Sequence, residues 1–152
     1  MKSPRQALLD LCDSVISDPA LRPNQPEEVE THCNEAVYKI SFPYGYDFYN
    51  RKTKDLMLAN EIFDWLSKNW CQIDGETANK IANDGNIAIA AQKGNPHGHV
   101  AVVYPGAMVY SSKWKRECPV LANVGERNAV MGANWAFAKE PYYFTDQKNT
   151  EA

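Results

Sequence analysis

The sequence predicts an α+β fold, in which helices from the first half of the chain pack on an antiparallel sheet formed by the second half. Apolar residues recur at helical spacing up to about residue 83, as on helices that bury one face. Asp84 and Gly85 then form a turn signal. After this turn the apolar residues are small or β-branched and come in short runs, which is typical of strands. Helices followed by strands indicate the α+β class, and a chain of 152 residues is expected to form a single domain over 1–152.

The chain is expected to begin with an amphipathic helix over residues 4–17. Five apolar residues of this helix are expected to pack inward: Leu8, Leu9, Leu11, Val15 and Ile16. Residues 18–27 hold three prolines and are interpreted as a connector. Glu28 is a plausible start for the next ordered segment.

Three more helices are predicted before the turn. Residues 31–40 form the first, because Val37 and Ile40 continue an apolar stripe. Residues 41–54 are aromatic and loop-like. Residues 55–69 carry a strong helical pattern, and residues 76–83 a short one. The apolar face of the longer helix consists of Leu56, Ala59, Ile62, Phe63 and Leu66, and Trp65 and Trp70 are interpreted as core residues.

The second half of the chain is expected to form the sheet. Residues 86–93 and 99–105 are predicted to be neighbouring antiparallel strands, joined by the loop "GNPHG". The stretches "MVYSS" and "PVLANVG" are candidates for further strands. The segment "GANWAF" (132–137) is expected to close the sheet or to shape the rim of a site.

Composition and charge narrow the functional classes. The net charge is −3, and a nucleic-acid binder would normally carry a basic stripe instead. No run of about 18 apolar residues occurs, so no membrane span is expected. Asp10, Asp13 and Asp18 interrupt the apolar residues near the N-terminus, and a secretory signal peptide is therefore not expected. The protein is expected to be made in the cytoplasm.

The cysteines are Cys12, Cys33, Cys71 and Cys118. No two of them form a C-x-x-C pair, so neither a structural zinc site nor a thiol-redox protein is favoured, and no metal or other cofactor is predicted. Without an export signal we predict no disulfide. Cys12 and Cys71 are interpreted as core residues.

Cys33 stands at the start of a predicted helix. It could be a small core residue, half of a disulfide, a metal ligand or a nucleophile. A nucleophilic cysteine needs a thiolate, a nearby base and a group that orients the base. The free N–H groups and the dipole at a helix N-terminus favour the thiolate.

The base must be one of three histidines. His32 adjoins Cys33, and neighbours on a helix point in different directions, so His32 is a poor partner. His97 and His99 share a face if their segment is extended, and spacing alone cannot choose between them. His99 is favoured because it lies on the predicted strand, where it would be held more firmly than His97 on the loop. Asn123 is the candidate orienting residue, because its amide oxygen can fix the imidazole tautomer. Each residue alone is more often structural than catalytic.

A resemblance strengthens this interpretation. "HCNEAVYKI", "LANEIFDWLSKNW", "ETANKIANDGNIAIAAQKG" and "GHVAVVYPG" lie between residue 32 and about residue 106. They resemble the NlpC/P60 and CHAP papain-like cysteine hydrolases, and look closer still to the first family of type VI secretion peptidoglycan amidase effectors. The resemblance implies a papain-like fold with Cys33 as nucleophile and His99 as general base. Asn123 is not part of it.

The same resemblance implies a function. It implies hydrolysis of the D-Glu to diaminopimelate bond of peptidoglycan, without a metal, in the periplasm of a target bacterium after secretion. It also implies a cognate immunity protein as a partner. A phage lysin or a wall-remodelling hydrolase of the same fold is an alternative. A binding module that kept the fold without the catalysis is another, from a different class.

Overall fold

The computed structural model describes residues 1–23 and 32–151. The predicted start at Glu28 and part of the predicted connector lie outside the described residues. The helices are α1 (Pro4–Ile16), α2 (Cys33–Ser41), α3 (Ala59–Asn69), α4 (Gly75–Asn83) and α5 (Ala133–Ala136). Short 3₁₀ turns cover Pro19–Leu21, Phe42–Tyr44 and Gln147–Thr150.

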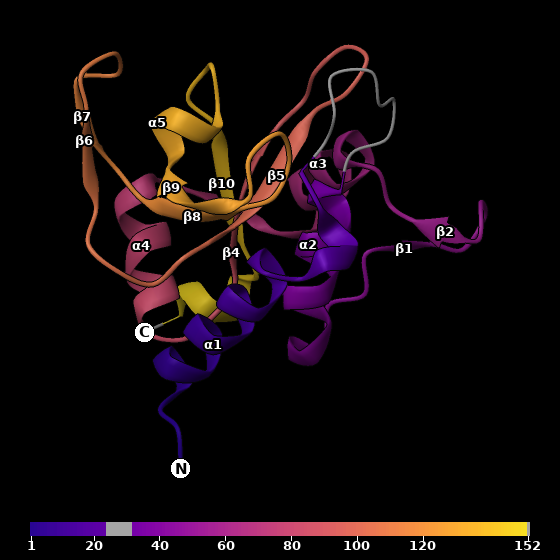
Figure 1. Ribbon diagram of the computed structural model, residues 1–152, viewed down its shortest axis with the longest axis horizontal. Coiled ribbons are helices and arrows are strands. Elements are labelled where there is room, and N and C mark those ends of the chain that lie inside the picture. The colour runs from indigo at the N-terminus through magenta and orange to yellow at the C-terminus, as the bar shows by residue number, and fades with distance from the viewer. Residues whose placement is uncertain (24–31, 152) are drawn as a thin grey trace.

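The main sheet has six antiparallel strands in the order β3-β10-β4-β5-β8-β9. These strands are β3 (Cys71–Ile73), β4 (Ala88–Gln92), β5 (His99–Val103), β8 (Val120–Asn123), β9 (Ala129–Gly132) and β10 (Tyr142–Thr145). The helices of the first half pack against this sheet, so the predicted α+β class is confirmed. Figure 1 shows two small hairpins at opposite ends of the molecule. They are β1 (Tyr49–Asn50) with β2 (Asp55–Leu56), and β6 (Val109–Ser111) with β7 (Arg116–Cys118).

The helix α2 packs against the central strand β5. Its buried residues Cys33, Ala36, Val37 and Ile40 recur at i, i+3, i+4 and i+7, and therefore form one apolar stripe. The stripe turns the first residue of the helix, Cys33, toward the interior. Cys33 is held in place because the other residues of this stripe are packed in the core.

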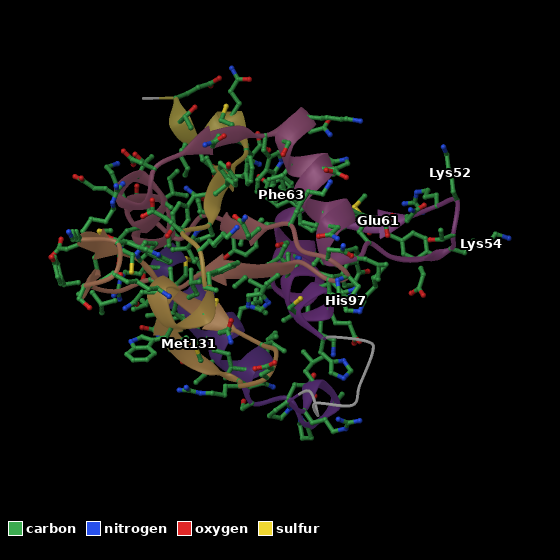
Figure 2. The ribbon with its side chains drawn as sticks, turned by 90° about the horizontal axis from the view of Figure 1, so that it is seen from above. Lys52, Lys54, Glu61, Phe63, His97 and Met131 are labelled. Carbon is green, nitrogen blue, oxygen red and sulfur yellow. The ribbon has the colours of Figure 1, made fainter. Side chains whose placement is uncertain are left out.

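The helix α3 packs on the same sheet through aromatic contacts. Phe63 packs edge-on against Phe144 of β10, with the ring centroids 5.7 Å apart (Figure 2). Trp70 is buried and Trp65 is partly buried against the core, in agreement with their interpretation as core residues. The predicted helix over 55–69 is wrong at its start, since residues 55 and 56 form the strand β2.

The turn at Asp84 and Gly85 is confirmed. Asp84 caps the end of α4, and Gly85 has a φ of +84°. A Cβ atom on Gly85 would lie 2.3 Å from the carbonyl carbon of Pro4, so only glycine allows α1 to begin against this turn. The turn thus fixes α1 on α4. Within the described residues, no helix is long and apolar enough to cross a membrane.

Candidate active site

Cys33 is the first residue of α2, as the sequence predicts to within two residues. The residue before it, His32, occupies the N-cap position but makes no side-chain capping hydrogen bond. The first backbone N–H groups of a helix have no partners within the helix. They therefore create a positive end beside the Cys33 thiol, which is only 1% exposed.

His99 and Asn123 meet across two paired strands. His99 opens β5, Asn123 ends β8, and the two strands pair antiparallel. The Nε2 atom of His99 lies 2.7 Å from the Oδ1 atom of Asn123. Asn123 is 5% exposed, and His99 is partly buried. Two strands of the sheet core therefore hold this pair in place.

The hydrogen bonds of Asn123 select the tautomer of His99. Its Nδ2 atom donates to the backbone carbonyl of Arg127 at 2.7 Å, which leaves the amide oxygen facing the imidazole. An oxygen can only accept, so Nε2 of His99 carries the proton. Nδ1 of the neutral ring is then the basic nitrogen, free to accept a proton from a thiol.

The third contact joins His99 to Cys33. Burial disfavours the imidazolium and taken alone lowers the pKa of His99. The hydrogen bond and the charge of the Cys33 side chain act against burial, together with the Asn123 bond and the charge of Glu126, and the net effect raises the pKa of His99. The structure thus brings Cys33, His99 and Asn123 together, in the order that a nucleophile, a base and an orienting group require.

The other two histidines lie outside this cluster. His97 is exposed on the loop between β4 and β5 (Figure 2). The Nδ1 atom of His32 lies 3.1 Å from Glu35, one turn later on α2. His32 is therefore a neighbour of the cluster with a partner of its own.

Three residues around His99 were not predicted as site residues. The ring of Phe137 lies against the imidazole, with centroids 4.9 Å apart, and it shields the ring because Phe137 is 5% exposed. Gly125 lies against the ring, since a Cβ there would be in van der Waals contact with Cε1 of His99, at 3.4 Å. Gln92 pairs with His99 across β4 and β5. Its buried Oε1 atom has no hydrogen-bond partner within the described residues.

Sequence signals for these three residues are weak. Gln92 could have been found from the register of the two predicted strands, because it ends one strand where His99 begins the next. Phe137 ends the "GANWAF" segment, which the sequence analysis expects either to close the sheet or to shape the rim of a site. The contact between Phe137 and the base is long-range, and local sequence cannot reveal it.

The other cysteines differ from Cys33. Cys12 is fully buried as predicted, and burial raises the pKa of its thiol to about 12. Cys118 is buried as well, and burial raises its thiol pKa. The interpretation of Cys71 as a core residue is wrong: it is only partly buried, because β3 is an edge strand. All four cysteines are among the described residues and none is in a disulfide.

The described residues contain no group of three His, Cys, Asp or Glu side chains that could hold a metal ion. Compared with known proteins, the chain matches no protein-family model. It also has no significant match among curated proteins.

Proposed function

We propose that this protein is a cysteine hydrolase of peptide amide bonds, with a papain-like arrangement of its site. The observation that carries the proposal is the connected set of Cys33, His99 and Asn123. A thiol at a helix start, a base on a strand and an amide that orients the base meet the needs of nucleophilic catalysis.

The first half of the reaction forms an acyl-enzyme. His99 takes the proton of Cys33 on Nδ1, and the thiolate attacks the carbonyl carbon of the amide bond. The backbone N–H of Cys33, at the start of α2, donates to the oxyanion. The imidazolium then gives its proton to the leaving nitrogen, the C–N bond breaks, and the amine departs.

The second half restores the enzyme. Neutral His99 removes a proton from water, and the hydroxide attacks the thioester carbonyl carbon. The C–S bond breaks and the proton returns to the thiol, so that a carboxylic acid leaves. Asn123 accepts a hydrogen bond from Nε2 throughout, and keeps the ring in the orientation that both proton transfers need.

The substrate class is proposed from the resemblance to peptidoglycan amidases. The bond would be the D-Glu to diaminopimelate amide of cell-wall peptides, and the protein would act in the periplasm of a target bacterium after type VI secretion. A cognate immunity protein that covers the Cys33 site would protect the producing cell.

Digestion of purified sacculi tests the proposal. Wild-type protein should release muropeptides, and mass spectrometry should show a new D-Glu carboxyl end and a new diaminopimelate amine. Cys33→Ala should lose at least about 10³-fold in rate, since the nucleophile is gone. The matched control is Cys12→Ala, which removes a thiol that is equally buried and should digest sacculi at the wild-type rate. Equal digestion by Cys33→Ala would overturn the proposal.

A further inference from the structure

A groove of about 550 Å³ is lined by residues between 109 and 135. Its lining residues come from β6, β8, β9 and α5 and from the loop after β8. Two of them present unusually exposed aromatic rings, with Trp135 at 75% and Tyr110 at 65%. A Cβ on Gly132 would lie 2.4 Å from Oδ1 of Asn134 and 2.6 Å from Cγ2 of Val109, so glycine leaves space for these two side chains of the groove.

Two contacts connect the groove to the base. The backbone carbonyl of Arg127, whose side chain lines the groove, accepts the hydrogen bond from Asn123. Phe137 packs on His99, and Trp135 stands two residues before it, on α5. The stretch from Trp135 to Phe137 therefore brings one ring to the groove and another to the imidazole. The lining of the groove is thus linked to the base through Asn123 and through the segment that carries Phe137.

The charge of Arg127 indicates which kind of ligand the groove could bind. Arg127 is exposed, and among residues 1–23 and 32–151 its guanidinium has no ion-pair or hydrogen-bond partner. It is the only charged residue that lines this groove within the described chain. A guanidinium pairs with a carboxylate through two parallel hydrogen bonds. The aromatic rings beside it favour aliphatic chain over further charge.

We propose that this groove binds the stem peptide of the substrate, with a carboxylate on Arg127 and the adjoining aliphatic chain over Trp135. The inference rests on the proposed function, because it names the part of that substrate which is recognised. Stem peptides carry free carboxylates near the D-Glu to diaminopimelate bond, and these match the single positive charge. The "GANWAF" segment thereby serves both the base and the substrate.

A binding experiment tests the groove without turnover. The probes are a synthetic L-Ala–D-Glu–diaminopimelate–D-Ala peptide with free carboxylates, and the same peptide with those carboxylates converted to carboxamides. Calorimetric titration into Cys33→Ala protein should show that the free acid binds about tenfold more tightly, as a charge-assisted pair predicts. Adding Arg127→Gln should bring the ratio of the two affinities close to one.

The matched control is Arg51→Gln. Arg51 is an exposed arginine near the tip of the β1–β2 hairpin, which projects from the end of the molecule away from Met131 of the groove (Figure 2). This variant should keep the tenfold ratio. Trp135→Ala should weaken both peptides alike, and Trp135→Phe should restore much of the affinity.

Four results would overturn the inference: equal binding of the two peptides, a ratio that survives Arg127→Gln, a ratio that Arg51→Gln also removes, or no binding of either peptide. Binding of a disaccharide without peptide, in place of the peptide, would also overturn it. Cleavage by wild-type protein is scored separately. Cleavage without carboxylate preference leaves the proposed function standing and rejects the groove. Binding that depends on Arg127, without any cleavage by wild-type protein, supports the groove and rejects the proposed function.

Discussion

The residues Cys12 and Cys33 are exposed to almost the same extent, at 0% and 1%, but they occupy different positions on their helices. Cys12 lies inside α1, where the backbone N–H groups are used by the helix itself. Burial then has no opposing partner and raises the pKa of the Cys12 thiol to about 12. Cys33 begins α2 and contacts His99. We therefore expect the position of a cysteine on its helix and its partner, as well as its burial, to decide whether its thiol reacts.

The largest difference is expected in thiol reactivity. With iodoacetamide near neutral pH, Cys33 should alkylate at least about 100-fold faster than Cys12, because His99 can accept its proton. Mass spectrometry of peptides after timed quenching gives both rates in one sample. His99→Gln should slow the reaction of Cys33, and the matched His32→Gln should not. Equal rates at the two cysteines in the folded protein would contradict the comparison.

The second prediction concerns Asn123, which orients the proposed base His99 beside Cys33. Asn123→Ala should lower the rate of muropeptide release by about tenfold or more, a part of the 10²- to 10⁴-fold that general-base catalysis supplies. The pKa of His99 should fall in this variant, because the Asn123 hydrogen bond raises it. NMR titration of the imidazole measures that fall. Asn69→Ala, an exposed control at the end of α3, should leave both quantities unchanged, and an unchanged rate in Asn123→Ala would reject its orienting role.

The contact between Cys33 and His99 can be tested by measuring the pKa of the His99 imidazole. The Cys33 side chain raises the pKa of His99. In Cys33→Ala protein the ring should therefore lose its proton at a lower pH than in wild type, while Cys12→Ala should leave the titration in place. NMR titration of both variants gives the two values. An unchanged or higher pKa in Cys33→Ala would mean that the thiol does not act on the ring.

The smallest effect is expected in stability. Cys12→Ala removes a fully buried sulfur atom from the core and should lower the free energy of unfolding by about 1–2 kcal/mol. Urea unfolding at neutral pH measures the loss. The digestion rate of sacculi should stay at the wild-type level, since Cys12 packs and does not react. A lost activity in folded Cys12→Ala protein would mean that the two thiols are coupled.

The errors in the prediction share one physical cause. The strand β10 pairs with β4 from more than 50 residues away, and no local pattern contains that pairing. Residues 55 and 56 fit the helical pattern that follows them, yet they pair with Tyr49 and Asn50. Tertiary pairing overrode the local preference there. Cysteine is a residue type that is often buried in the core, but Cys71 lies on an edge strand and is partly exposed.

The sequence by itself determined the class of the fold, the start of α2 close to Cys33 and the strand that carries His99. These features depend on periodicity and turn residues, which act over a few neighbours. Only the tertiary structure decided which groups meet. The register of β5 with β8 joined His99 to Asn123, and the return of the chain through α5 placed Phe137 on the imidazole and Trp135 in the groove. Such contacts depend on pairings between distant segments, because side chains far apart in sequence meet only when the whole sheet has formed.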